Sequence, residues 1–318
     1  MDRTELERII VGPIATVPTP FDDDYEVDYG RMSELTKRWV SEGLVKGKAV
    51  IKVSAAMGEG PMLSDEEWPS LLRTVVRAAD DKAAIVCGLH YKDTKRTIED
   101  AKRAEALGAH ALQVCPPIFN LPSQDDLLDY YNDLSNAIDI GIMVYHTHWM
   151  SGGLIELDTI MKFKEISNIV SLKWSNPEGV DYDEMAKFSS FLNVIDNGGD
   201  VIRCHQLGGR GYINLTAESY PSHDLKVWDL IENKKYGEAR ALMDSVDTPL
   251  REFYDKISAR SGGQGRLKKG LMALMGQPVG SSRPPSKPMN DEEMDGLREV
   301  LEGIGWPVAS RAEVAAAR

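Results

Sequence analysis

The segment Ile169-Val-Ser-Leu-Lys-Trp-Ser175 places a charged amine, Lys173, inside an apolar run with the composition of a β-strand. Burying an unpaired ammonium is costly, so such a lysine reaches solvent at a sheet edge, pairs with a carboxylate, or loses its proton. A neutral lysine amine is a nucleophile that forms a Schiff base with a carbonyl substrate. The rest of the chain decides between an edge-strand lysine and a reactive one.

Short apolar runs alternate with amphipathic helices on both sides of this segment. Thr94–Leu107 has apolar residues at helical spacing and stops at Gly108, and Ser123 is a suitable N-cap for the next helix. About eight strand–helix pairs over roughly 220 residues favour an α/β fold of the (βα)8 TIM-barrel type. A doubly wound sheet is disfavoured because no glycine-rich phosphate turn follows the first strand. The predicted strands are Ile14–Val17, Ala49–Val53, Ala84–Leu89, Ala111–Cys115, Ile142–Tyr145, Ile169–Lys173, Asn193–Ile195 and Tyr212–Leu215.

The pattern changes after Pro221, where only helix-like segments remain. We therefore predict a barrel over residues 1–221 that carries the active site, an appended C-terminal helical region over 222–308, and a flexible tail over 309–318. In this arrangement Lys173, Tyr145 and Glu59 all fall at or just beyond the C-terminal ends of strands. Barrel enzymes carry their catalytic groups there, which favours a functional Lys173.

The composition excludes several classes of partner and site. The 318 residues carry a net charge of −13, which argues against nucleic acid or an anionic membrane surface as a partner. The cysteines, Cys87, Cys115 and Cys204, are odd in number and widely spaced, so neither a disulfide framework nor a structural zinc site is expected. The chain lacks an apolar signal core and a run of about 18 apolar residues, which predicts a cytoplasmic protein without a membrane span.

Six short motifs follow one another along the barrel region. They are Gly12-Pro-Ile-Ala-Thr-Val-Pro-Thr-Pro-Phe21, Gly58-Glu59, Leu63-Ser-Asp-Glu-Glu67, Cys115-Pro-Pro117, Val144-Tyr145 and Ser171-Leu-Lys-Trp174. In order and spacing, from about residue 11 to residue 221, the chain resembles the dihydrodipicolinate synthase and N-acetylneuraminate lyase family of Schiff-base barrel enzymes.

The resemblance implies a set of roles. Lys173 would form an imine with a 2-oxo acid such as pyruvate, and Tyr145 would donate and accept protons. The protonated imine is an electron sink, so the family's chemistry requires no organic cofactor and no metal. A small-molecule carbonyl compound is the implied substrate, and the family commonly forms homotetramers.

Three polar anchors of the family are replaced by apolar residues. Ala55-Ala56-Met57-Gly58-Glu59 stands where the family usually has Gly-Thr-Thr-Gly-Glu, Phe119 replaces a tyrosine of the proton relay, and Met150 falls at the position of a carboxylate-binding arginine. We therefore expect a divergent member that is not dihydrodipicolinate synthase itself. Its pocket should be more apolar, with Trp149 and Trp174 nearby, and should suit a partner such as an aromatic aldehyde.

New polar residues follow Tyr145. His146 and His148 are two apart on an extended segment, so their side chains point to the same side. Such a pair can act as acid and base, bind a carboxylate or ligate a metal, and either histidine alone can be structural. Because the imine already supplies the electrophile, we predict catalytic histidines that replace the lost relay and no metal site. Further predicted pocket residues are Ser54, Ala56, Met57, Gly58, Glu59, Ser175, Asn197 and Asn214.

Three functions stay open from the sequence. The first is an aldolase or lyase that acts through a Lys173 imine. The second is a dehydratase or deaminase that uses the same imine but expels water or ammonia. The third is a catalytically silent barrel that senses a ligand or serves as a scaffold, and retention of both Lys173 and Tyr145 argues against it.

Overall fold

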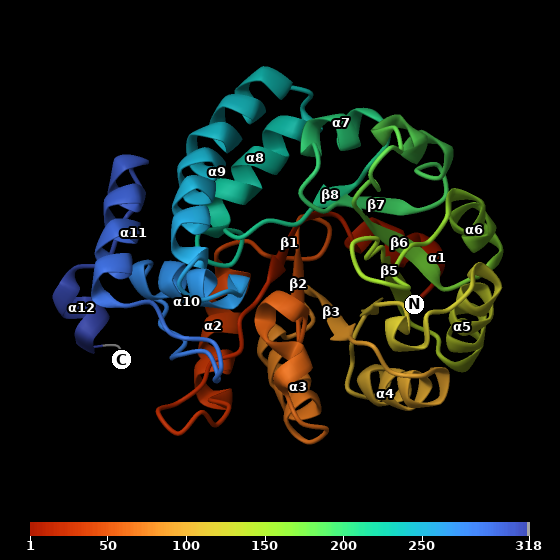
Figure 1. The fold of residues 1–318 in the computed structure, drawn as a ribbon, viewed down its shortest axis with the longest axis horizontal. Coiled ribbons are helices and arrows are strands. Elements are labelled where there is room, and N and C mark those ends of the chain that lie inside the picture. Colours follow the sequence, from red (N-terminus) through yellow and green to blue (C-terminus); the bar gives the residue numbers. More distant parts are fainter. Residues whose placement is uncertain (317–318) are drawn as a thin grey trace.

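Eight parallel strands close into one barrel in chain order, and helices cover its outer face (Figure 1). The computed structural model of the chain describes residues 1–316. The predicted (βα)8 fold is confirmed, and every predicted strand overlaps an observed one. The strands are β1 (Gly12–Thr16), β2 (Val50–Val53), β3 (Ala84–Leu89), β4 (Ala111–Val114), β5 (Gly141–Tyr145), β6 (Ile169–Trp174), β7 (Asn193–Asp196) and β8 (Gly211–Tyr212).

Helices connect the strands and continue beyond them. Ser123 caps α5 as predicted, and it forms a reciprocal capping box with Asp126. Short 3₁₀ turns, η1 (Ala56–Gly58), η2 (Gly60–Met62) and η3 (Ile118–Asn120), follow β2 and β4. The helices are α1 (Arg3–Ile9), α2 (Tyr29–Ser41), α3 (Glu67–Ala79), α4 (Thr94–Ala106), α5 (Gln124–Ala137), α6 (Leu157–Lys162), α7 (Val201–Gln206), α8 (Pro221–Glu232), α9 (Tyr236–Ser258), α10 (Gln264–Leu274), α11 (Asp291–Gly303) and α12 (Arg311–Ala316).

The part of the barrel interior near the N-terminal ends of the strands is a closed apolar core. Inward side chains of the strands, Ile14, Val50 and Val86 among them, pack with Leu6 and Ile9 of α1. Alternate strand residues point outward and pack under the helices. Because α1 seals this end, the interior is accessible only from the C-terminal ends of the strands.

A β-bulge in β6 decides where Lys173 points. Ile142 pairs with Ile169, but Met143 pairs with Ser171, so β6 contains one extra residue, Val170. Val170 packs in the barrel interior, whereas Leu172 packs in the outer layer. Strict alternation from Val170 would turn Lys173 outward; the extra residue reverses the alternation and turns Lys173 inward.

The C-terminal part differs in two places from the predicted divisions. Helix α8 completes the barrel: Trp228 packs with Tyr212 of β8, whose hydroxyl donates to Asp224 at 2.8 Å. The predicted boundary at 221–222 therefore falls before the last barrel helix. Within the segment predicted as a flexible tail, α12 is helical and buries Val314 against α9–α11. Residues 317 and 318 of that tail lie outside the described residues.

Helix α10 packs against the loop after β2, and two buried ion pairs hold it in place. Lys269 contacts Glu59, in the loop after β2, at 2.8 Å, with both side chains 5% exposed. Lys268 pairs with Glu218, in the loop after β8, and both side chains are fully buried. These pairs connect the appended helices to the loops that carry the candidate site.

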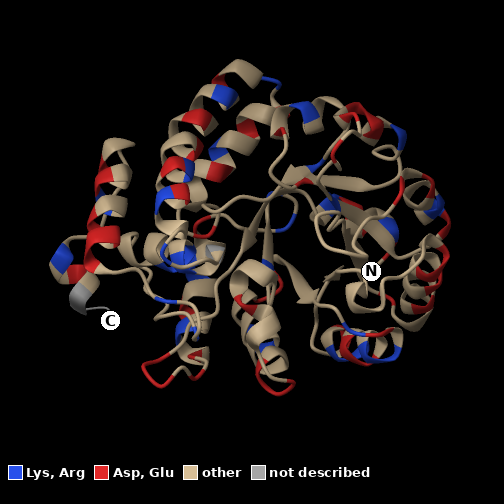
Figure 2. Cartoon of the chain, viewed as in Figure 1, with Lys and Arg blue, Asp and Glu red and all other residues tan. Residues whose placement is uncertain are grey.

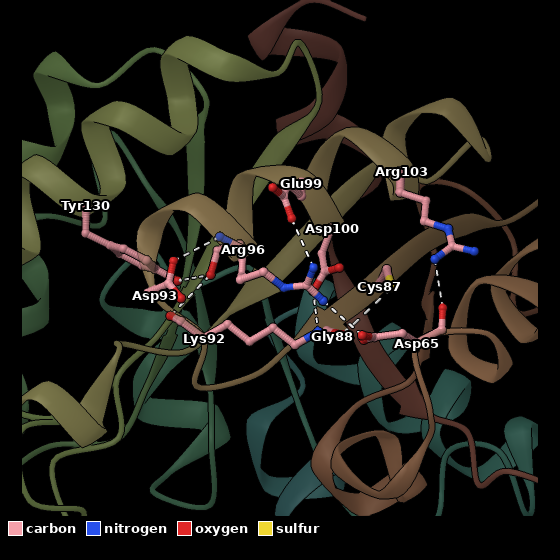
Figure 3. Close-up of polar contacts among 11 residues, drawn as sticks. Asp65, Cys87, Gly88, Lys92, Asp93, Arg96, Glu99, Asp100, Arg103 and Tyr130 are labelled. Atoms are coloured by element: carbon pink, nitrogen blue, oxygen red, sulfur yellow. Dashed lines mark hydrogen bonds and ion pairs between the residues drawn. The ribbon is translucent and has the colours of Figure 1, made fainter.

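Charged residues of both signs are spread over the outer helices, as the colours of the ribbon show (Figure 2). Lys92, just before α4, is the centre of a cluster of ion pairs (Figure 3). Lys92 contacts Asp65 at 3.0 Å and Asp100 at 2.7 Å, and Arg96 contacts Asp65 at 2.9 Å. This network ties the segment before α3 to α4, with the modest stabilisation expected of exposed ion pairs. Within residues 1–316, the helices are all too short or too polar to cross a membrane.

Candidate active site

A cavity of about 1090 Å³ lies at the C-terminal ends of the strands, between the barrel and helix α9. Lys173 and Tyr145 both line it, and so do Asn197 and Asn214 from the ends of β7 and β8. Trp149, 53% exposed, stands at its edge. The cavity therefore brings together residues that are far apart in the sequence.

Lys173 is the central amine of this cavity. It is 4% exposed and is paired in register with Tyr145 on the neighbouring strand. Its Nζ lies 3.6 Å from the centre of the Tyr145 ring. Burial lowers the pKa of Lys173 to about 7; Cys115 acts in the opposite direction, and the amine has no carboxylate partner among the described residues. A substantial fraction of the amine is thus unprotonated at neutral pH.

Tyr145 has the opposite protonation behaviour. Burial raises the pKa of its hydroxyl, and a contact with the Asn197 side chain acts against this rise. The hydroxyl therefore keeps its proton at neutral pH and is available as a donor. The ring is held edge-on against Trp149, with centres 5.8 Å apart.

The two histidines lie together, as predicted, but His146 does not face the cavity. Because Tyr145 points inward, His146 points outward. Its ring stacks on Trp174 at 4.9 Å, and its Nδ1 lies 2.9 Å from the carbonyl oxygen of Ser175. Burial lowers the pKa of His146 to about 4, so the ring is neutral. His148 lies beside it, with ring centres 5.3 Å apart, and is likewise absent from the cavity lining.

The loop after β2 contributes Ala56, Met57 and Glu59 to the cavity wall. The carboxylate of Glu59 already has a cationic partner in Lys269. Gly58 packs against the backbone of Val17 instead. Ser54 has a left-handed φ of 55°, and its carbonyl oxygen lies 2.9 Å from the Nε2 of His90. Ser54 does not line the cavity.

Four further predicted pocket residues do not reach this cavity. Phe119 is 94% exposed on η3, and Met150 accepts a weak hydrogen bond from Tyr91 at 3.5 Å. Trp174 packs outside the barrel wall between His146 and Phe188. The Ser175 hydroxyl donates to the carbonyl of Asn197 and accepts from its side chain at 2.9 Å, so it supports a lining residue without lining the cavity itself.

The sequence reasoning missed three residues at the cavity floor: Thr16, Lys52 and Gln113. Lys52 lies in the apolar run of β2, as Lys173 lies in that of β6, so the same signal was present. It also missed the contribution of α9, which places Arg240, Asp247 and Arg251 along the outer wall. The amphipathic spacing of α9 predicts that one face of this helix is buried but does not identify the part of the protein against which it packs.

Comparisons with known proteins agree with this architecture. The model of the dihydrodipicolinate synthetase family matches residues 9–304. A 4-hydroxy-tetrahydrodipicolinate synthase of Heliobacterium modesticaldum is 27% identical over 305 residues, 95% of this chain and 98% of the relative. One of Chloroherpeton thalassium is 30% identical over 235 residues, 73% of this chain and 74% of the relative. The solved dihydrodipicolinate synthase of Aquifex aeolicus shares the fold at 24% identity, with a TM-score of 0.82 over 95% of this chain and 100% of the other. The chain therefore belongs to the dihydrodipicolinate synthetase family, a family of class I aldolase-type lyases, as its ordered motifs predicted.

Proposed function

We propose that the protein is a Schiff-base lyase that joins a 2-oxo acid or a related carbonyl compound to Lys173. The observation that carries the proposal is the amine itself. Lys173 is buried, faces a cavity and has a pKa near 7, so it can attack a carbonyl carbon at neutral pH. Lysines kept for ion pairing have a carboxylate partner, whereas Lys173 contacts the face of a tyrosine ring.

The chemistry follows from the two facing groups. The Lys173 nitrogen adds to the carbonyl carbon, and the Tyr145 hydroxyl passes a proton to the oxygen that leaves as water. The resulting protonated imine accepts the electron pair released when the neighbouring carbon loses a proton or a carbon–carbon bond breaks. An enamine forms; its reprotonation and hydrolysis of the imine restore the free amine.

The second fragment of the substrate would lie against the loop after β2. Ala56, Met57 and Trp149 all line the cavity wall and offer apolar surface that suits an aromatic aldehyde. Charged residues of α9 line the outer end of the same cavity, so a fragment with both an apolar and a polar part fits this wall best. We thus propose a substrate other than that of the dihydrodipicolinate synthases. A dehydratase or deaminase is the second candidate, because the same enamine can expel a leaving group.

Borohydride trapping tests this proposal. The protein is incubated with pyruvate and a panel of oxo acids and aldehydes, reduced, and mapped by peptide mass spectrometry. We expect a reduced adduct on the peptide that contains Lys173, none in Lys173→Ala, and an unchanged adduct in Lys162→Ala, which removes an exposed lysine of α6. A folded protein that traps no carbonyl compound would overturn the lyase and dehydratase candidates together and favour a ligand-sensing or scaffold barrel.

We also propose a homo-oligomer, a homotetramer by the family resemblance. The loops after β4 and β5 carry exposed apolar side chains, Phe119, Leu121, Trp149 and Leu154. The two loops are adjacent, since a side chain at Gly152 would contact Leu121. Exposed apolar patches of this kind mark interaction surfaces. Light scattering of the wild type and of Phe119→Glu tests the proposal: we expect the variant to dissociate, and a monomeric wild type would contradict it.

A further inference from the structure

A second lysine lies in the barrel interior with Lys173. Lys52, on β2, is fully buried and lines the floor of the same cavity. In register it stands beside Thr16 of β1, and its Nζ donates to the Oε1 of Gln113, on β4, at 2.7 Å. Neither Lys52 nor Gln113 has a role in the imine chemistry described above.

The polar atoms at this floor are mostly donors without acceptors. A lysine amine can donate more than the one hydrogen bond that Gln113 accepts. The Nε2 of Gln113 and the hydroxyl of Thr16 are buried and have no hydrogen-bond partner in the described part of the chain. Buried polar groups are normally paired, so three donors gathered around one space indicate an acceptor that arrives with a ligand.

The electrostatics of the floor favour a negatively charged acceptor. Burial and the neighbouring amines of Lys173 and Lys268 lower the pKa of Lys52. The Cys115 thiol and the carboxylate of Glu218 act in the opposite direction, and Glu218 is already paired with Lys268. An incoming anion would stabilise the protonated form of Lys52 and satisfy the free donors of Thr16 and Gln113 at the same time.

We propose that Lys52, together with Gln113 and Thr16, binds the carboxylate of the oxo acid whose carbonyl carbon is joined to Lys173. This inference rests on the proposed imine and names its substrate class, a carbonyl compound with an adjacent carboxylate. The flexible stem of Lys52 lets its Nζ turn from Gln113 toward the cavity. The pair of hydroxyls absent from Ala56 and Met57 would thus be replaced from the floor of the barrel.

The test compares a charged and a neutral ligand in matched variants. Pyruvate and methyl pyruvate are titrated against wild type, Lys52→Met and Thr16→Val, with borohydride trapping and peptide mapping. Loss of a charge-assisted hydrogen bond should raise the pyruvate concentration for half-maximal trapping by about 10- to 100-fold in Lys52→Met. The methyl pyruvate value should stay within about threefold, which also shows that the variant is folded. Thr16→Val removes only a buried hydroxyl and should shift the pyruvate value in the same direction by about three- to tenfold.

Each other outcome has a distinct meaning. Equal effects on both ligands, or no effect on either, would overturn the carboxylate site while leaving the Lys173 imine in place. A reduced adduct on Lys52 itself would do so too, because the amine would then be a nucleophile. If wild type forms no adduct with either ligand, the imine is wrong, and the carboxylate site fails with it.

Discussion

Replacing Lys173 with methionine should stabilise the protein while removing the proposed nucleophile. The side chain lies in the barrel interior with no carboxylate partner among the described residues, and burial lowers its pKa from 10.5 to about 7. In the unfolded chain the same lysine is fully hydrated. The folded state therefore binds fewer protons than the unfolded state between pH 7 and 10.5, and the stability of the wild type rises with pH across this window. Below pH 7 the full cost of the buried amine remains.

The magnitude follows from the change in pKa. At about 1.4 kcal/mol per tenfold change in proton affinity, the cost approaches about 5 kcal/mol below pH 7. Between pH 7 and pH 9 the wild type should regain about 2 kcal/mol of this cost. Lys173→Met lacks this term, so its advantage over wild type should shrink by the same amount over that interval. Relief of repulsion on the nearby Lys52 acts in the same direction at neutral pH.

The assay is urea unfolding of wild type and Lys173→Met at pH 7 and pH 9, followed by circular dichroism. Lys162→Met, an exposed substitution on α6, controls for the general effect of removing a lysine. Comparing the pH-dependent change, and not the absolute stability, cancels differences in packing between lysine and methionine. If wild type and Lys173→Met respond equally to pH, the lysine is not a desolvated amine, and the reasoning is refuted.

Three further predictions concern the same region. Trapping of pyruvate by wild type should rise with pH through about 7 and then level off, because only the neutral Lys173 amine attacks; a rate that falls with pH over this range would contradict this. Tyr145→Phe should keep the fold but slow adduct formation by about 10²- to 10⁴-fold. His146→Asn changes a residue outside the cavity and should slow adduct formation by less than about tenfold. A larger effect of His146→Asn than of Tyr145→Phe would restore a catalytic His146. Lys269→Met should leave Glu59 buried without its partner and lower the free energy of unfolding in urea by about 3–5 kcal/mol. Adding Glu59→Gln to the same chain should largely restore the free energy of unfolding, because it removes the unpaired charge.

The sequence alone determined the elements and their order. Alternating apolar runs and helical spacings predicted the eight strands to within a few residues, because strand and helix periodicities are local properties. The ordered motifs around Lys173 and Tyr145 predicted the family. Position at a strand end predicted that these two residues share a site, since parallel strands bring their C-terminal ends to one face.

The tertiary structure decided which way side chains point and which distant residues meet. The extra residue at Val170 turns Lys173 inward, and no local pattern reveals a bulge that exists only against the neighbouring strand. The inward direction of Tyr145 sends His146 to the outer layer, whereas the spacing of the two histidines predicts both in the pocket. Lys52 and Gln113, 61 residues apart, become partners only because β2, β3 and β4 are neighbours in a closed barrel. Burial is the physical reason in each case, since the packing of the whole chain determines which groups lose contact with water.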